Sequence, residues 1–533
     1  MAFTVVQAGS KLYKVNPDTG AATELTLPTG VTLSTTRKPQ FAVLNQWVAL
    51  VNSPTQNLVI DPEGTVRLMT PRAPAQPPLV ASGGAGNITG SIRVKTSFAV
   101  YGTDGQLYME SPLSPQSQAV SLAANSLSIS NIQVSTEGTT GWQRKVYRTL
   151  AGGTVYYNIG AVEDNVGTTL LHDLADAGVE LLPVVEEDLV SPPGTLPGTW
   201  MKTVAQWKSR LWGVSSAADK VDEVIYTEEN KVYAWPNRLT AWPTGQHREG
   251  VVGLAPRRDE LGVIKKGGLW QITGDGDTFG LVQVQAGQGG GISADTIIAI
   301  DDYVYWLGDD GVWEWGPDGL KNISDEMVAP WFKSDVFFNR TRFQYAFAKY
   351  NAVRKTYDLH LAGTGDSTET RWVSYNIENK KWYGPHLTSA FTPSAAELVQ
   401  DSNDLPMVLM GGTNGIVYKM NQSTFHDGTV TAIAMDITGP MHFANAPDIE
   451  HYWDMLSMLT KVESAGTMTI TPTVGRLNSA AGSAITHTLT TGRERLRRLG
   501  AGAGVQLRFQ QSTVDVGGTI FGYEIPFHEL GRR

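Results

Sequence analysis

The sequence predicts an all-β protein: a β-propeller of about six blades, with an inserted immunoglobulin- or fibronectin-like sandwich and a C-terminal β-sandwich or jelly-roll domain. The first observation is composition, because 56 glycines, 27 prolines and only 18% charged residues among 533 suit many short strands and tight turns. The second is the recurrence of short apolar runs with alternating polarity. The third is a pair of segments rich in proline and glycine, which interrupt this recurrence and indicate domain boundaries.

One stretch, residues 287–324, shows the expected blade most clearly. Four short apolar runs follow one another, and the turns between them lie at residues 301–302, 308–311 and 316–319. Two of these turns contain Asp-Gly pairs, which favour the positive φ of tight hairpins. Because a propeller blade has about 40 residues and four strands, we expect one complete blade here. A meander that is apolar on both faces must pack against similar units, as blades do.

Two hinge-like segments bracket a module with a different spacing of strands. They are Pro71–Pro78 and Ser191–Gly198. About seven predicted strands between them match an immunoglobulin-like sandwich inserted into a propeller loop, so deletion of this module should leave a folded protein. The predicted parts are residues 1–75 (first propeller part), 76–192 (inserted domain), 193–435 (remaining blades) and 436–533 (C-terminal β-domain).

The last predicted blade is incomplete, because residues 406–420 are not followed by clear outer strands. The N-terminal residues 1–15 have the alternation of strands and stand at the other end of the predicted propeller. We therefore expect the ring of blades to close with strands from both ends of the chain. Residues 1–75 are expected to contribute one blade with an extra strand or two.

Several classes of function have no support in the sequence. The chain has no cysteine, which excludes disulfide scaffolds, thiol enzymes and cysteine-ligated zinc sites. The net charge of −10 argues against a nucleic-acid binder held by a basic face. No run of 18 apolar residues occurs and no signal-peptide pattern opens the sequence, so we expect neither membrane insertion nor export by a signal peptide. Phosphate-loop, zinc-protease and serine-hydrolase motifs are also absent.

Acidic side chains near aromatic residues are the candidates for catalysis or cation binding. Propellers can hold two carboxylates about 5–10 Å apart, as glycosidases require. Most of the candidates lie in glycine-flanked turns, where Asp is favoured by turn chemistry alone, so we expect no enzyme activity, cofactor or metal site. Calcium binding at the Asp-rich turns stays open, although no complete ligand loop is present. The candidates are Asp275, Asp277, Asp309, Asp310 and Glu314. Alternation along a strand would place Glu314 on the face opposite its neighbours Trp313 and Trp315.

The most basic run of the chain lies in the predicted C-terminal domain. Arg493, Arg495, Arg497 and Arg498 occur within six residues of a net-acidic chain. Arginine is favoured where planar pairing with carboxylates across an interface is needed, so we predict that this run takes part in a partner interface. The alternative is that these arginines only form a solvated surface. Strand alternation would place the first three arginines on one face.

Two sets of residues resemble a known family. Residues 287–324 combine a glycine turn, the run Val304–Val312 and a closing Asn-Ile-Ser, while residues 110–115 and 146–173 match an inserted module. Both resemble structural tail proteins of short-tailed bacteriophages, namely the tail nozzle, also called the tubular tail or DNA-stabilisation protein. The resemblance covers most of residues 1–430 and, more weakly, the C-terminal domain.

The resemblance implies a structural virion protein with no catalytic residue to carry over. Several copies, most often six, would form a homo-oligomeric ring below the portal and its adaptor ring. The ring would bind tail fibre, spike or needle proteins, and would retain and conduct double-stranded phage DNA during ejection. Such a protein would assemble in the host bacterial cytoplasm and reside in the tail of the virion. Two alternatives stay open: a receptor-binding, lectin-like propeller with exposed aromatic residues, and a glycan-degrading enzyme with converging carboxylates.

Overall fold

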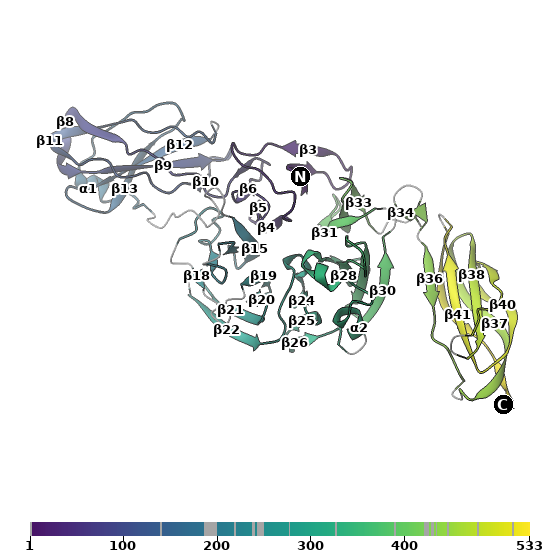
Figure 1. The fold of residues 1–533 in the computed structure, drawn as a ribbon. Helices are drawn as coiled ribbons and strands as arrows, with labels where there is room; N and C mark the ends of the chain where they lie inside the picture. Colours follow the sequence, from purple (N-terminus) through teal and green to yellow (C-terminus); the bar gives the residue numbers. More distant parts are fainter. Residues whose placement is uncertain are drawn as a thin grey trace. The chain divides into compact units, whose positions relative to one another are not determined.

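The computed structural model shows a chain built almost entirely from β-strands (Figure 1). Strands make up 55% of it and helices 4%, which confirms the predicted all-β class. The strands form many small antiparallel sheets, and none of these closes into a barrel in the described part of the chain. The chain divides into two compact units, residues 1–386 with 394–411 and residues 387–393 with 412–533. The structure describes residues 3–138, 141–185, 200–217, 220–236, 240–241, 250–276, 278–325, 328–388, 391–420, 426–427, 431–432, 434–444, 447–476, 479–513 and 516–532.

The N-terminal residues form two sheets, one of three strands and one of four, where one blade with an extra strand or two was expected. Leu12 of the first sheet packs with Leu50 and Leu58 of the second in one hydrophobic core. The first sheet contains β1 (Thr4–Ala8), β2 (Lys11–Val15) and β3 (Ala22–Leu25). The second contains β4 (Gln40–Leu44), β5 (Trp47–Val51), β6 (Leu58–Ile60) and β7 (Val66–Leu68).

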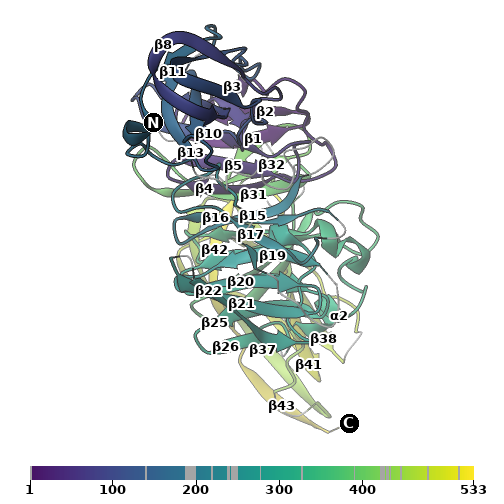
Figure 2. The ribbon, with the colours of Figure 1, turned by 90° about the vertical axis from the view of Figure 1, so that its left-hand side faces the viewer.

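The strands of the predicted insertion form two antiparallel sheets around a common core. That core takes Ile92 from β8, Leu127 from β11 and Val146 from β12, so both sheets contribute to it. Figures 1 and 2 show the long strands β8 and β11 side by side, as their register requires. One sheet has the order β10-β9-β12-β13 and the other β14-β11-β8. The elements are β8 (Leu79–Ile92), β9 (Val94–Tyr101), β10 (Leu107–Glu110), β11 (Val120–Ser130), β12 (Trp142–Thr149), β13 (Tyr156–Val162), β14 (Leu170–His172) and the short helix α1 (Asp176–Val179).

A second core joins this module to the sheets on either side of it in the sequence. Trp47 of β5, Met109 of β10 and Met201 of the following sheet belong to one buried cluster. The rings of Trp47 and Tyr108 meet edge to face, with centroids 5.2 Å apart. The module is therefore not packed as an isolated body, and its deletion would expose apolar side chains of the sheet β4–β7.

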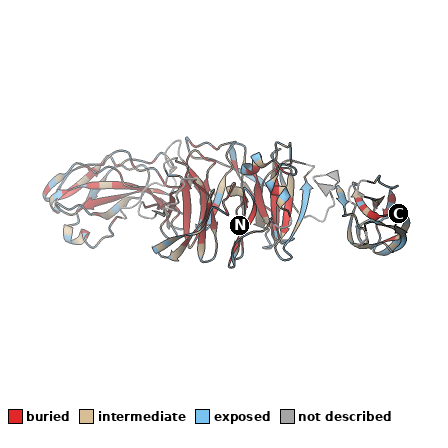
Figure 3. Ribbon diagram, turned by 60° about the horizontal axis from the view of Figure 1, so that its bottom comes forward, coloured by how far each residue is buried: buried red, intermediate tan, exposed pale blue. Residues whose placement is uncertain are grey.

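Residues 200–388 form four consecutive four-stranded sheets, each with its strands in chain order. The stretch 287–324 gives one of them, β23–β26, with turns at the predicted places. Buried residues concentrate along the strands of these sheets (Figure 3). The strands are β15 (Met201–Trp207), β16 (Arg210–Ser215), β17 (Val224–Tyr226), β18 (Thr240–Ala241), β19 (Val251–Pro256), β20 (Glu260–Lys265), β21 (Gly268–Asp275), β22 (Thr278–Ala286), β23 (Ile298–Ile300), β24 (Tyr303–Gly308), β25 (Gly311–Gly316), β26 (Gly319–Asn322), β27 (Phe347–Asn351), β28 (Thr356–Leu361), β29 (Arg371–Asn376) and β30 (Lys381–Leu387). Short helical turns are η1 (Ala294–Thr296), α2 (Ala329–Lys333) and η2 (Arg340–Tyr345).

The first strands of successive sheets pack against one another in chain order. β4 lies against β15, β15 against β19, β19 against β23 and β23 against β27. The segment that leads into β4 also reaches the last of these sheets: Lys38 donates to the carbonyl oxygen of Tyr345 at 3.0 Å and lies over the Phe347 ring. Lys38 and Gln40 both contact the carboxylate of Asp295, which precedes β23. Residues more than 250 positions apart thus meet beside these first strands.

We expect that replacing one partner of the Lys38–Asp295 pair costs more stability than replacing both, as in a poorly solvated ion pair. Burial raises the pKa of Asp295, and Lys38 opposes that shift from a distance of 3.5 Å. Lys38→Met should lower the free energy of unfolding by about 1–3 kcal/mol, because it leaves a desolvated carboxylate with one partner fewer. The double variant Lys38→Met/Asp295→Asn should recover most of the loss in chemical denaturation. If the double variant loses as much stability as Lys38→Met alone, or as much as the two single variants together, the two side chains do not stabilise each other and the pair is ordinary solvated surface.

The predicted closure by strands from both chain ends is not seen in the described residues. β31 (Pro393–Gln400), β32 (Pro406–Gly412) and β33 (Val417–Lys419) form their own sheet, and β1–β3 form another. A hydrogen bond joins a turn of each sheet: the backbone amide of Ser402, between β31 and β32, donates to the carboxylate of Asp18, between β2 and β3, at 3.2 Å. Side-chain and backbone contacts at turns, rather than shared strand pairing, link these regions.

The C-terminal unit contains two antiparallel sheets around a common core. Leu456, Ile470 and Phe509 belong to that core and come from both sheets. One sheet has the order β36-β41-β38-β39, and in the other β37 pairs with β40 on one side and with β42 and β43 on the other. The strands are β34 (His426–Asp427), β35 (Thr431–Ala432), β36 (Met435–Thr438), β37 (Ile449–Ser464), β38 (Thr467–Gly475), β39 (Ile485–Thr488), β40 (Gly492–Gly502), β41 (Gly504–Gln511), β42 (Gly517–Glu524) and β43 (Phe527–Arg532). None of the helices among the described residues has the length and apolar character to cross a lipid bilayer.

Candidate functional site

The predicted arginine run lies on β40, an edge strand of its sheet. Within the described residues β40 pairs with β37 alone, so its other side is open. Charged side chains and bulges on edge strands discourage pairing with a foreign strand. The run therefore has one clear physical effect in a single copy of the chain: it keeps an 11-residue edge from accepting another strand.

A β-bulge changes which arginines share a face. The register between β37 and β40 shifts between the pairs Met455–Arg498 and Ser457–Arg495, so two residues of β40 stand opposite one of β37. Leu496 and Leu499 pack toward the core, while Arg493, Arg495 and Arg498 are exposed. Simple alternation predicted Arg497 on the exposed face with the first two; the bulge puts Arg498 there instead.

Three of the four arginines have partners inside the chain. Arg493 pairs with Glu524 of β42, and Arg498 pairs with Asp454 at 3.0 Å. Arg497 donates to the carbonyl oxygen of Ser483 at 2.9 Å. Arg495 has no hydrogen bond or ion pair within the described residues, and its guanidinium is the one most available to a partner.

Exposed apolar side chains accompany Arg495 on this sheet. Leu459 stands opposite Arg493 in the register and is 45% exposed, and Phe521 on β42 is 64% exposed. Aromatic side chains and arginine are enriched in the cores of protein–protein interfaces. The arginine face thus combines a free cation with apolar surface, which is the composition of an interface with a protein rather than with bulk water.

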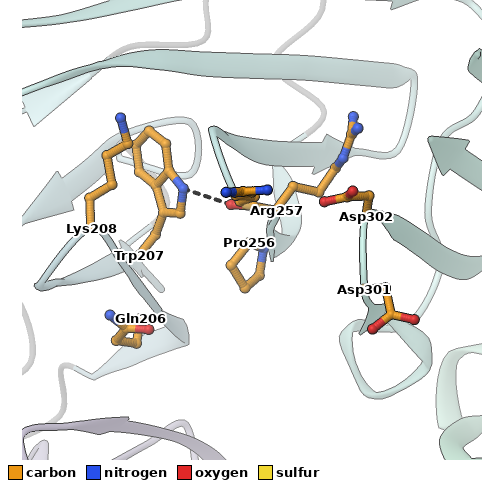
Figure 4. Close-up of a pocket in the computed structure, with 8 residues that line it drawn as sticks. Gln206, Trp207, Lys208, Pro256, Arg257, Asp301 and Asp302 are labelled. Atoms are coloured by element: carbon orange, nitrogen blue, oxygen red, sulfur yellow. Dashed lines mark hydrogen bonds between the residues drawn. The ribbon is translucent and has the colours of Figure 1, made fainter. Parts of the chain in front are cut away.

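A depression of about 620 Å³ lies at the turns that follow β15, β19 and β23, which are the first strands of three successive sheets (Figure 4). Trp207 is among its lining residues and donates from its indole nitrogen to the carbonyl oxygen of Arg257 at 2.8 Å. The Arg257 guanidinium lies 4.4 Å from the Trp315 ring centre and pairs with Glu260 at 2.8 Å. The lining residues are Gln206, Trp207, Lys208, Pro256, Arg257, Arg258, Asp301 and Asp302.

The charges of the depression are mixed, and part of them is unpaired. Arg258, Asp301 and Asp302 make no hydrogen bond or ion pair with the described residues, whereas Lys208 donates to the carbonyl oxygen of Gly274 at 2.6 Å. Trp207, the one aromatic lining residue, is only 3% exposed and cannot stack on a sugar. The sequence identified residues 301–302 as a turn but missed the depression, because its lining comes from three separate sheets.

The carboxylates considered for catalysis do not converge. Asp309 pairs with Arg340 at 3.1 Å, and Asp310 accepts a hydrogen bond from the Trp313 indole at 2.9 Å. Glu314 lies on the strand face opposite Trp313 and Trp315, as predicted, where it faces the buried Tyr305 and raises the pKa of that phenol together with burial. Asp275 lies in a different sheet near Lys208, and Asp277 falls outside the described residues. The described residues contain no cluster of three or more His, Asp or Glu that could hold a metal ion, including at the Asp-rich turns.

A buried polar layer on the sheet β27–β30 went unnoticed in the sequence. Asp358 is 1% exposed and accepts hydrogen bonds from Thr356 at 2.7 Å and Ser374 at 2.6 Å. Lys349, its register partner on β27, is 3% exposed, and burial lowers its pKa to about 8. The fully buried His360 stacks on Phe347, and burial holds its pKa well below the usual value. Thr356, Asp358 and His360 occupy alternate positions of β28, and this alternation is the sequence signal by which the layer could have been found.

No protein-family model matches the chain, and no curated protein is significantly similar to it.

Proposed function

We propose that the chain is a structural subunit of the tail nozzle of a short-tailed bacteriophage. In this proposal the sheets β4–β7 and β15–β33 are blades of a β-propeller, and several copies, six by the family pattern, form a ring below the portal and adaptor. The ring retains the double-stranded genome and conducts it during ejection, and it carries fibre, spike or needle proteins. The protein would then be a virion component that assembles in the host cytoplasm.

The observation that carries the proposal is the succession of small sheets whose first strands pack together in chain order. The sheets β15–β18, β19–β22 and β23–β26 each contribute to two hydrophobic cores, one shared with the sheet before and one with the sheet after. In a propeller, too, no single blade buries its own apolar faces, and this likeness supports the proposal. Together with the two-sheet module between β7 and β15, it supports the resemblance drawn from residues 110–173 and 287–324.

The C-terminal unit supports an assembly role through its arginine face. Arg495 is unpaired among the described residues, and the same sheet carries exposed Leu459 on β37 and exposed Phe521 on β42. Repeated around a ring, a cation on partly apolar surface sets register and partner choice, even though one exposed pair contributes only about 0–1 kcal/mol. We propose that this face contacts the neighbouring copy or the adaptor ring.

The ring is tested by the mass and the low-resolution image of the purified particle. A ring of about six copies is expected from the family pattern. A monomer that binds host surface glycans would favour the lectin-like alternative. Depolymerisation of those glycans that Glu314→Gln abolishes would favour the enzyme. Either result would overturn the structural role.

The arginine face is tested by charge reversal. Arg495→Glu should lower ring or tail incorporation at least about tenfold, because a like-charge contact costs several kcal/mol at an interface. The matched control is Arg476→Glu, which reverses an exposed arginine of the same unit that makes no side-chain hydrogen bond or ion pair with described residues. Circular dichroism should show both variants folded. If Arg495→Glu assembles as well as the control, the interface lies elsewhere and β40 carries arginines only to protect its edge.

A further inference from the structure

The strand β22 presents an unusually open edge. It is the last strand of the sheet β19–β22 and lies at its rim (Figure 1), and no described strand pairs with its outer side. It runs for nine residues, Thr278–Ala286, without a charged side chain or a proline. Such an edge offers a row of unpaired backbone donors and acceptors to another strand.

The outer strands of the other four-stranded sheets in the same unit are covered or protected. β13 has seven residues without a charge or a proline, but residues 183–185 cover its outer side: the Asn158 amide donates to the carbonyl oxygen of Pro183 and the Val185 amide to that of Tyr156, each at 2.9 Å. β7 has three residues and β18 has two, β26 has four with Lys321 among them, and β30 carries both Lys381 and Pro385. Short length, lysine and proline are the usual devices that blunt an edge. The one irregularity of β22 is a register shift near its C-terminal end, which leaves residues 278–283 in regular pairing.

Gly280, at the middle of this regular stretch, has no function inside its own sheet. Its φ lies outside the left-handed region, and a Cβ built on it would meet nothing closer than the Thr273 hydroxyl at 3.8 Å. Glycine in a strand weakens it by about 0.5–1 kcal/mol relative to alanine, and often marks the close approach of another backbone. Neither packing nor backbone conformation requires the residue here.

We propose that β22 pairs with β22 of a second copy of this chain, antiparallel, about a two-fold axis at Gly280. This register keeps each residue on its own face and sets Thr278 opposite Val282 and Phe279 opposite Leu281. Pairs of β-branched and of aromatic and aliphatic side chains stabilise antiparallel strands. Val282, now 57% exposed, would be covered.

The absence of charge selects the second copy as the occupant. A charged strand laid beside Val282 would desolvate its charges without a partner, whereas β22 brings none. Among the described outer strands of the four-stranded sheets in this unit, β22 alone combines length and neutrality with an uncovered outer side. The contact is isologous and closes on itself, so it is a separate contact from any ring interface, and the inference does not depend on the proposed function.

Single-cysteine cross-linking tests the register directly, because the chain has no cysteine of its own. Under mild oxidation, full-length Gly280→Cys should form a disulfide-linked dimer at least about tenfold faster than the control Val353→Cys. Val353 lies in the turn between β27 and β28 and is 63% exposed, so the control thiol is equally accessible. Equal rates for the two variants would overturn the proposal.

A charge introduced on β22 provides a second test of the proposed pairing. Val282→Lys should shift the chain from dimer toward monomer in sedimentation velocity, and Val282→Lys/Gly280→Cys should cross-link no faster than the control. Val353→Lys should leave the dimer intact, and circular dichroism should show all variants folded. A wild-type chain that stays monomeric at high concentration, or a dimer that Val282→Lys leaves unchanged, would overturn pairing through β22.

Discussion

Replacing Asp358 by alanine is expected to lower the free energy of unfolding by about 3–5 kcal/mol, one of the largest effects of a single substitution in this chain. The carboxylate is buried and accepts hydrogen bonds from Thr356 and Ser374, and its charge offsets part of the burial of the Lys349 ammonium. Alanine would leave two buried hydroxyls without their acceptor and one buried cation without its counter-charge. Chemical denaturation measures the loss.

Lys349→Met is the matched test of this reasoning. Added to Asp358→Ala, it should restore part of the lost stability, since a buried pair replaced by apolar groups is often neutral. A double variant as unstable as the sum of both single variants would show that the cation is not the source of the loss.

The pH dependence of the Lys349 variant checks the same point with a defined sign. Burial lowers the pKa of Lys349 to about 8 in the folded chain, from 10.5 when exposed. Between these values the unfolded chain binds more protons, so this group makes stability rise with pH; below about pH 8 it is charged in both states and its penalty is constant. The difference in stability between wild type and Lys349→Met should therefore change in favour of wild type from pH 8 to 10. A difference that stays constant would contradict a depressed pKa.

Trp47→Ala is the second substitution with a large expected effect, about 3–5 kcal/mol. Trp47 is 8% exposed and packs in the core that joins the sheet β4–β7 to the two-sheet module and to β15. The cavity should loosen the module as well as the sheet, because both contribute side chains to that core. Hydrogen exchange of β9 and β10 should accelerate together with that of β5.

Tyr108→Phe is the control for Trp47→Ala. It keeps the edge-to-face ring contact at Trp47 and should change stability by less than about 0.5 kcal/mol. If Trp47→Ala affects β5 alone, the module folds independently, and the deletion of residues 76–192 should be tolerated as the sequence suggested.

Much of the local structure was predictable from the sequence alone. The stretch 287–324 forms the four strands β23–β26 with turns where Asp and Gly occur, and the predicted all-β class is confirmed. Alternating polarity and turn residues act within a few positions of the chain, so they are visible without a structure. The placement of Glu314 opposite its two neighbouring tryptophans followed from the same rule.

Only the tertiary structure decided which residues meet. The bulge in β40 exchanges Arg497 for Arg498 on the exposed face, because register depends on β37, some 40 residues earlier in the chain. The contact of Lys38 with Asp295, the shared core around Trp47 and the depression at Arg257 join separate sheets, and no local pattern encodes them. Period-two alternation determines which face of a strand a side chain occupies; the partner across that face is set by packing among strands that are distant in sequence.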